Sequence, residues 1–334
     1  MPNIFKVYFF VLMISLFTAC QNNHRAIDIA ENIQLESVRF DRALMHADTS
    51  NIDFFVDSVS NLYPRFFNTY TNAVLGIGGP QQKMFFDYLK AFIANDISRS
   101  VYLEIQNKFP ETEQVSQDIS EAFSHYHYYF PKHEVPQLFY FQSGFNQRVF
   151  IDSGVVAVAL DMSLGEDNAF YQQLAMPNYM RQKMVTETIA LDVMRGLLWS
   201  DFEFKENEYL AANMVYEGMI QYALNYLFPN LPENACFPYS EEQWNWLLKN
   251  EKLIWSSVLD QEMLYQTDRM KIKNMMSDAP FTQQFGNQSP AKIGVWLGWR
   301  IVSEYMEEHP ELSLNDLMHQ TDYIAILNES GYRP

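Results

Sequence analysis

Two long stretches carry apolar residues on most of their sides and organise the rest of the chain. Residues 179–199 and 206–228 both repeat apolar side chains at helical spacing, with few polar positions between them. A helix that is apolar nearly all round is typical of a buried core element. The pattern therefore predicts a central pair of helices over these two ranges.

Three acidic residues interrupt these apolar stretches. Glu187 and Asp192 fall on the first predicted helix, and Glu217 falls on the second. A helical zinc protease has a similar layout, in which one helix carries His-Glu-x-x-His and a later helix supplies a glutamate ligand. Here Thr186 and Ala190 occupy the two histidine positions. The pattern predicts a degenerate zincin-like fold that has kept the acids and lost the metal site, so we expect neither a bound metal nor a cofactor.

The remaining periodic segments predict a predominantly helical α+β protein. Helical spacing recurs over 48–63, 65–74, 81–93, 98–108, 115–128, 241–249, 251–264, 292–306 and 314–319. Residues 265–290 and the C-terminal tail are polar and are predicted to be mostly irregular.

A short β-rich region precedes the helix pair. The runs 138–141, 149–151 and 155–160 are rich in β-branched and aromatic residues and are separated by glycine-containing turns, which predicts a small antiparallel sheet. Residues 33–40 alternate apolar and polar side chains, as in a strand or an extended arm. No repeat or low-complexity linker divides the chain, so residues 32–334 are predicted to form one domain.

The N-terminus has the pattern of a bacterial lipoprotein signal. Lys6 precedes an apolar run, and small residues then lead to Cys20. We therefore expect a signal peptide over 1–19, a lipid on the Cys20 thiol and a tether over 20–31. The first residues after Cys20 contain no acidic run, which favours a periplasm-facing anchor at the outer membrane.

The charge of the chain limits its partners. The formal net charge is -18, and the basic residues are scattered without a cationic stripe. Nucleic-acid binding depends on clustered Lys and Arg that displace counterions, so we do not expect a nucleic acid as partner.

Several ordered motifs together resemble the gliding-motility lipoprotein family GldB of Bacteroidetes. They are Val38-Arg-Phe-Asp41, Tyr63-Pro-Arg-Phe-Phe67, Tyr128-Tyr-Phe-Pro131, Ala159-Leu-Asp-Met-Ser-Leu-Gly165, Pro177-Asn-Tyr179, Val215-Tyr-Glu-Gly218, Asn250-Glu251, Ile254-Trp255, Pro280-Phe-Thr282 and Gly294-Val-Trp-Leu-Gly298. The resemblance implies a cell-envelope protein needed for gliding or for a related type IX secretion process. It also implies a distant similarity to predicted zinc proteases that keep His-Glu-x-x-His.

These observations leave two main hypotheses and a weaker third. The leading hypothesis is a non-enzymatic protein that binds envelope partners of the gliding or secretion machinery through a protease-like cleft. The alternative is an unorthodox hydrolase that uses Glu187, Glu217 and Asp192 without a metal. The third, a glycan-binding module, rests only on the high aromatic content. Under the leading hypothesis Glu187 is a buried acid held by its neighbours, and Glu217 pairs with Arg181 or Arg195 or contacts the sheet.

Overall fold

The structure is a computed structural model that describes residue 29, residues 32–205 and residues 208–334. The predicted signal peptide, Cys20 and all of the predicted tether except Ile29 lie outside the described residues. Among the residues that are described, no helix has both the length and the hydropathy needed to cross a bilayer.

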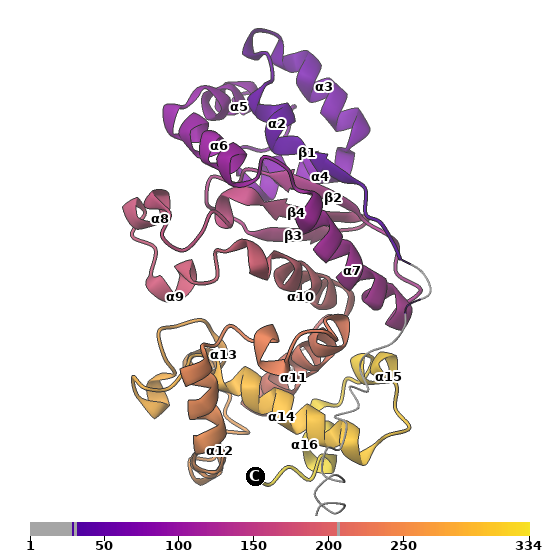
Figure 1. Cartoon of the computed structure of the whole chain (residues 1–334), viewed down its shortest axis with the longest axis vertical. Helices are drawn as coiled ribbons and strands as arrows, with labels where there is room; N and C mark the ends of the chain where they lie inside the picture. Colours follow the sequence, from indigo (N-terminus) through magenta and orange to yellow (C-terminus); the bar gives the residue numbers. More distant parts are fainter. Residues whose placement is uncertain (1–28, 30–31, 206–207) are drawn as a thin grey trace, which may run out of the picture.

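A four-stranded mixed sheet lies in the upper half of the molecule (Figure 1). Its strands are β1 (Ser37–Arg39), β2 (Gln137–Phe141), β3 (Val149–Asp152) and β4 (Val155–Ala159), in the order β1-β2-β4-β3. β1 pairs with β2, and β2 with β4, in parallel, and only the β3–β4 hairpin is antiparallel. The predicted antiparallel sheet is therefore wrong. All five residues of β4 are buried, and such a continuous apolar strand suits a central parallel position that is covered on both faces.

The two faces of the sheet belong to two different hydrophobic cores. Leu138 and Tyr140 of β2 contribute to one core, whereas Phe139 and Phe141 contribute to the other. This alternation follows from the two-residue period of a strand. In the second core Phe66 stacks on Phe139, with ring centroids 4.1 Å apart. Because an apolar core packs against each face, most side chains of β2 and β4 are apolar on both sides of the sheet.

The first group of helices follows β1 and covers the aromatic face of the sheet (Figure 1). Its members are α2 (Phe40–Met45), α3 (Ile52–Leu62), α4 (Pro64–Thr69) and α5 (Phe85–Ala94). α6 (Asp96–Lys108) follows them in the chain, but its buried Val101 and Ile105 belong to the other core. Most of the predicted helices in this region are confirmed to within a few residues. Residues 65–74 differ, because α4 changes to a π-helical turn at Tyr70–Val74.

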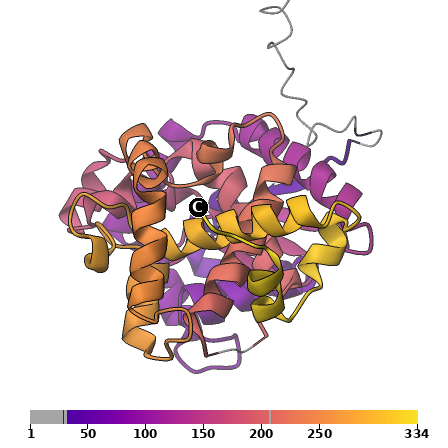
Figure 2. The same ribbon diagram turned by 90° about the horizontal axis from the view of Figure 1, so that it is seen from below.

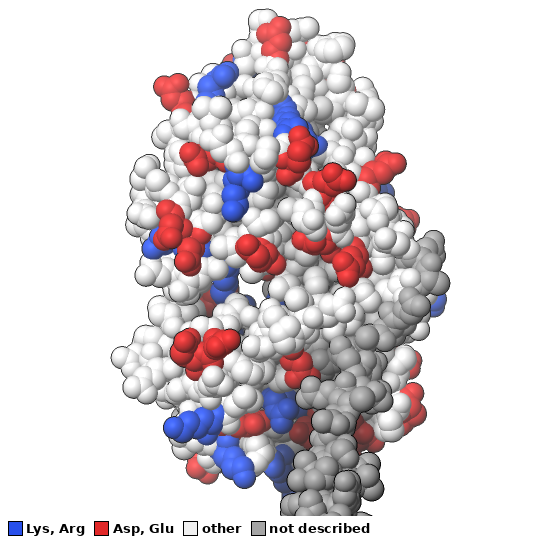
Figure 3. Space-filling view, in the orientation of Figure 1, with Lys and Arg blue, Asp and Glu red and all other residues white. Residues whose placement is uncertain are grey.

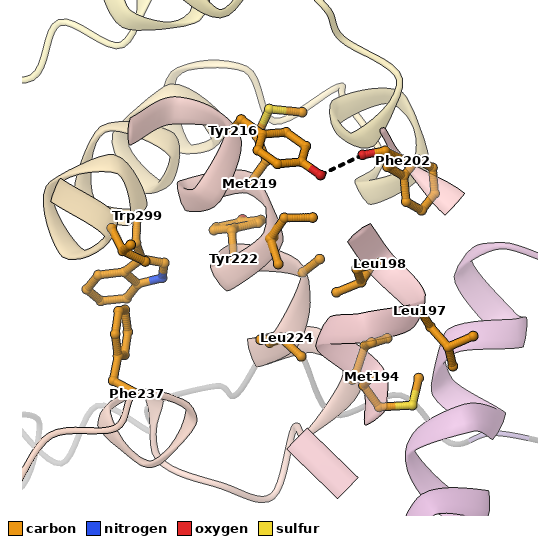
Figure 4. Packing of buried hydrophobic residues seen from close by; sticks show 14 of the residues in the cluster. Met194, Leu197, Leu198, Phe202, Tyr216, Met219, Tyr222, Leu224, Phe237 and Trp299 are labelled. Carbon is orange, nitrogen blue, oxygen red and sulfur yellow. Dashed lines mark hydrogen bonds between the residues drawn. The ribbon is translucent and has the colours of Figure 1, made fainter. Parts of the chain in front are cut away.

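The second group packs around the other core and extends from the side of the sheet to the lower end of the molecule (Figure 1). It comprises α7 (Glu113–Tyr129), α8 (Ala169–Gln173), α9 (Asn178–Arg181), α10 (Ile189–Asp201), α11 (Leu210–Leu227), α12 (Glu241–Asp260), α13 (Arg269–Met276), α14 (Ile293–Glu308), α15 (Leu314–Met318) and α16 (Tyr323–Glu329). The view from below shows α12 and the last helices lying across this end of the molecule (Figure 2). Apolar side chains of α10 face those of α11 in the core (Figure 4).

Two segments predicted to be irregular contain helices, and one helix is longer than predicted. α13 lies within 265–290, α16 lies in the C-terminal tail, and α12 joins the two helices predicted over 241–264. The Asp268 side chain caps α13 by accepting from Met270 N, and Asp322 caps α16 by accepting from Ala325 N. These aspartate caps satisfy backbone N–H groups that would otherwise lack partners, and they were visible signals in the sequence.

The central helix pair is confirmed in part. α11 matches the second predicted helix, but one helix over 179–199 is wrong, because α9 ends at Arg181 and α10 begins only at Ile189. Between them the Thr188 hydroxyl donates to Lys183 O and Val185 O. Such local side-chain hydrogen bonds compete with helical backbone pairing, and Thr186–Thr188 form only a short 3-10 turn.

The backbones of α11 and α14 cross in direct contact at two glycines. A Cβ placed on Gly218 would lie 2.2 Å from Gly298 C, and a Cβ on Gly298 would lie 1.7 Å from Met214 O. Neither position has room for a side chain, which explains the glycines that end the Tyr-Glu-Gly and Trp-Leu-Gly motifs. The crossing places Glu217, the neighbour of Gly218, close to the start of α14.

Candidate functional site: a charged cleft

A cleft of about 760 Å³ lies between β3 and α10 on one side and residues 235–238, Asp278 and Lys292 on the other. Its upper wall comes from residues 146–151 and from α10. Its lower wall comes from residues 235–238, Asp278 and Lys292, the residue just before α14. Figure 3 shows the molecule hollowed at this height, with basic side chains at the edge of the hollow. We call this hollow the cleft.

The cleft is positively charged although the chain is acidic. Four basic side chains line it, Arg148, Lys183, Arg195 and Lys292, against two acidic ones, Asp192 and Asp278. The lining therefore has a formal charge of +2 in a chain whose formal charge is -18. Charges of one sign gathered in a cleft concentrate the local field and attract ligands of the opposite sign.

Arg148 and Asp192 form an ion pair across the upper wall. Arg148 Nη1 lies 3.0 Å from Asp192 Oδ2, and the Arg148 guanidinium also donates to Thr188 and to Val185 O. Burial lowers the pKa of Arg148, and the nearby Asp192 charge opposes this. Asp192 is thus paired with the arginine that directly precedes β3, and it is not a lone acid.

Asp278 binds two lysines from different parts of the chain. Its carboxylate forms a short ion pair with Lys183 and lies 3.4 Å from Lys292 Nζ. Burial alone would raise the pKa of Asp278, but Lys292 and Lys183 outweigh it, and the pKa lies below its ordinary value. The pKa of Lys292 is lowered, first by burial and then by the like charges of Arg195 and Lys183.

Glu217 lies in a side cavity of about 490 Å³ that shares Trp199, Asp278 and Lys292 with the cleft. The Trp199 indole donates a hydrogen bond to the Glu217 carboxylate. Burial raises the pKa of Glu217 above its ordinary value, although Lys292 and Arg195 oppose the rise. Glu217 was predicted to pair with Arg181 or Arg195; the Arg195 charge acts on Glu217, but the ion pairs among the described residues include none between them. Arg181, the other predicted partner, donates instead to Glu166 O and Asn178.

Glu187 is not part of this site. It lies on the 3-10 turn before α10 and is exposed, so the prediction of a buried acid at this position is wrong. It does not line the cleft or the side cavity, and the two acids of the proposed hydrolase are therefore not brought together. Asp192 and Glu217 remain as the predicted residues that the fold places at the cleft and its side cavity.

The part of the chain that the structure describes brings no three His, Cys, Asp or Glu side chains together in a group able to hold a metal ion. Thr186 and Ala190 supply neither an imidazole nor a thiolate, the ligands that zinc prefers. The zincin-like layout itself stays a prediction. Of the two positions that correspond to the histidines, Ala190 lies in α10 and Thr186 lies in the 3-10 turn before it.

Sequence reasoning missed most of the cleft. Arg148, Lys183, Asp278 and Lys292 come from four separate segments and show no common spacing. Asp278 lies two residues before the Pro280-Phe-Thr282 motif, in a segment that was predicted to be irregular. Charged residues assembled by tertiary contacts leave no periodic trace in a sequence.

A second hollow, which we call the apolar groove, has a similar size and a different lining. It encloses about 640 Å³ between the end of α5, the start of α6, residues 142–145 and α8. No charged side chain is among its lining residues, which include Phe92, Ile97, Phe145 and Leu174.

The fold and the cleft define a mainly helical α+β protein with a charged cleft. The family model for gliding motility protein GldB matches residues 22–334, almost the whole chain, and the chain therefore belongs to this family. Membership associates the chain with gliding motility and with the cell envelope. No curated protein and no solved structure matches the chain.

Proposed function

We propose that this GldB-family member is a non-enzymatic, lipid-anchored envelope protein that supports gliding motility or a related type IX secretion process. In this proposal it binds a protein partner in the cleft, and Cys20 carries the lipid that holds it at the periplasmic side of the outer membrane. The observation that carries the proposal is the cleft itself, a wide positively charged hollow in an acidic molecule.

The composition of the cleft favours binding over hydrolysis. Its lining contains no histidine, and the predicted general base Glu187 is exposed elsewhere. Three of its charged groups, Lys183, Lys292 and Asp278, are already engaged with one another. Apolar side chains such as Leu191, Ile151 and Phe237 line the same hollow, and this mixture of apolar and polar groups is typical of binding sites.

One observation favours a hydrolase as the second candidate function. Glu217, with a raised pKa, lies near Lys292, with a lowered pKa, at the edge of the cleft. Groups whose pKa values are shifted towards neutrality suit acid–base chemistry. If the chain were such a hydrolase, the natural chain would cleave peptide or ester substrates and the Glu217→Gln variant would not. Under our proposal neither the natural chain nor the variant cleaves them.

Co-isolation from cells tests the binding proposal. Trp199 is 41% exposed at the cleft, and Tyr88, on α5 and away from the cleft, is 53% exposed. We expect Trp199→Ala to lose envelope proteins that co-isolate with the natural full-length chain, and Tyr88→Ala to retain them. Equal recovery with both variants would contradict a partner in the cleft. Loss of membrane fractionation in Cys20→Ser tests the lipid anchor separately.

A further inference from the structure

Arg195 is a basic side chain of the cleft that makes no direct ion pair among the described residues, although the charge of Glu217 in the side cavity acts on it. Its Nη1 lies 3.5 Å from Gln221 Oε1 and its Nη2 donates to Cys236 O at 3.2 Å, and both acceptors are neutral. No ion pair within the described residues joins Arg195 to a carboxylate, whereas Arg148, Lys183 and Lys292 each have one. A guanidinium has five N–H donors, so Arg195 keeps donors for a ligand.

The neighbours of Arg195 hold its guanidinium in place. Gln221 is 1% exposed on α11, and its Nε2 donates to Cys236 O at 3.1 Å. The same carbonyl and the same amide therefore fix both ends of the guanidinium. A charged fork that is already oriented loses less conformational entropy when it binds an anion.

Lys292 adds a second incompletely compensated charge beside Arg195. It lies 3.4 Å from Asp278, which is shared with Lys183, and the Glu217 charge opposes its positive charge without a direct ion pair among the described residues. The positive charges of Arg195 and Lys183 act on Lys292 in a partly desolvated setting. An anion between Arg195 and Lys292 would relieve this repulsion, because electrostatic interactions are strong where water is excluded.

We propose that the cleft recognises an acidic peptide segment, with a glutamate or aspartate carboxylate seated between Arg195 and Lys292. This proposal rests on the proposed function and names the chemistry of the partner. Arginine pairs with planar carboxylates through two parallel hydrogen bonds. Leu191, Ile151 and Phe237 give the segment apolar contacts beside its carboxylate, and a volume of about 760 Å³ holds several side chains.

A singly charged carboxylate fits the cleft better than a phosphate does. Asp192 and Asp278 line the same hollow and leave a formal charge of only +2. A phosphate monoester carries a charge of about −1.5 to −2 near neutral pH. It would meet stronger repulsion from the two aspartates than a carboxylate does.

Calorimetric titration of the full-length chain in detergent tests this assignment. The probes are a blocked leucine–glutamate–leucine tripeptide, its glutamine counterpart and its phosphoserine counterpart. We expect the glutamate peptide to bind at least about tenfold more tightly than the other two, a difference of about 1.4 kcal/mol. Added salt should weaken its binding, because charge pairs that are open to solvent are screened.

Matched variants locate the binding to the two basic groups. Arg195→Gln should weaken the glutamate peptide by about tenfold or more, and Arg195→Lys should restore part of the loss. Arg99→Gln removes the same charge from an exposed position on α6 and should change nothing. If thermal denaturation shows that Arg195→Gln is not folded, titration of Lys292→Gln with the glutamate peptide tests the assignment instead.

Three results would overturn the assignment. They are equal affinity for the glutamate and glutamine peptides, tighter binding of the phosphoserine peptide, and no binding of any peptide. If one of these results came together with loss of partners in Trp199→Ala, the carboxylate assignment would fail and the proposed function would stand. If Trp199→Ala kept its partners, the proposed function would fail as well.

Discussion

The cleft and the apolar groove are similar in volume and opposite in chemistry. The cleft, of about 760 Å³, gathers six charged side chains, whereas the groove, of about 640 Å³, has none. Charged groups in a partly buried site carry a desolvation cost that uncharged linings avoid. Of these two linings only that of the cleft bears this cost, which is the physical reason for assigning recognition to the cleft and not to the groove.

The same contrast holds for one buried acid beside each hollow. Asp161 is fully buried next to the groove-lining loop and accepts hydrogen bonds from Ser143 N, Ser143 Oγ and Phe145 N. Glu217 faces Lys292 and Arg195 at the cleft. Hydrogen bonds from Ser143 and Phe145 satisfy the first acid, whereas the charged side chains of Lys292 and Arg195 surround the second. Only the second arrangement leaves charged groups accessible to a ligand.

The largest expected effect comes from breaking the helix crossing that positions the cleft. Gly298→Ala would force a Cβ against Met214 O, and a backbone atom cannot move aside as a side chain can. We expect a loss of roughly 3 kcal/mol or more in the free energy of unfolding, measured by chemical denaturation. Gly196→Ala on α10 is the control, because the nearest atoms to its Cβ would be side-chain atoms, of Ile151 at 3.2 Å and of Val149 at 3.7 Å, and its cost should stay within about 1 kcal/mol. Equal costs would contradict the crossing.

The buried acid beside the groove predicts a pH dependence of stability. Burial raises the pKa of Asp161 to about 6, although the hydrogen bonds from Ser143 and Phe145 oppose the rise. An unfolded aspartate titrates near pH 3.9, so the folded state binds the extra proton between these values, and stability falls as the pH rises from about 4 to about 6. The change approaches about 3 kcal/mol at its largest.

Asp161→Asn isolates this contribution. Denaturation curves of the natural chain and the variant at several pH values should show a stability difference that changes across this window and is constant above it. A difference that does not vary with pH between about 4 and 6 would mean that Asp161 titrates normally.

The acid beside the cleft should respond to shape and hydrogen bonding more than to charge. Glu217→Gln keeps an acceptor for the Trp199 indole, and its free energy of unfolding should change by less than about 1 kcal/mol. Glu217→Leu leaves the indole and Lys292 without this partner and should cost roughly 1–3 kcal/mol. Chemical denaturation of both variants compares them directly. Equal stability would show that Glu217 contributes no structural hydrogen bond.

The smallest effect is expected in the groove. Ile97 lines it and is 65% exposed, so Ile97→Ser should alter the free energy of unfolding by no more than about 0.5 kcal/mol. It should also leave the recovery of partners unchanged in the co-isolation assay. A loss of partners equal to that of Trp199→Ala would make the groove a second binding surface and remove the contrast between the two hollows.

Sequence periodicity predicted the elements of this fold better than their pairing. Helices such as α7 and α14 were clear because their apolar spacing extends over several turns. The strands were also predicted, but their pairing was not. β4 pairs in parallel with β2 while β3, which lies between them in sequence, is at the edge of the sheet, and no local pattern encodes this order. The break before α10 involves hydrogen bonds from the Thr188 side chain to Lys183 O and Val185 O. Threonine also occurs within helices, so its presence alone did not predict the break.

The site was predictable only where an acid interrupted an apolar helix. Asp192 and Glu217 stood out for that reason, and the fold places both at the cleft or its side cavity. Glu187 met the same criterion but is exposed, and it lies on the 3-10 turn that precedes α10, which begins only at Ile189. Arg195 and Lys292 became visible as a pair only when α10 and the start of α14 were placed on opposite walls of one hollow.

Site-specific photo-cross-linking in living cells tests most directly the claim that the cleft is the binding surface. A photoreactive residue replaces Ser200, which is exposed on the cleft wall, or Leu174, which is 52% exposed in the groove. Cross-linked adducts with envelope proteins should form from position 200 and be absent from position 174. Adducts from position 174 with none from position 200 would contradict the claim and assign recognition to the groove.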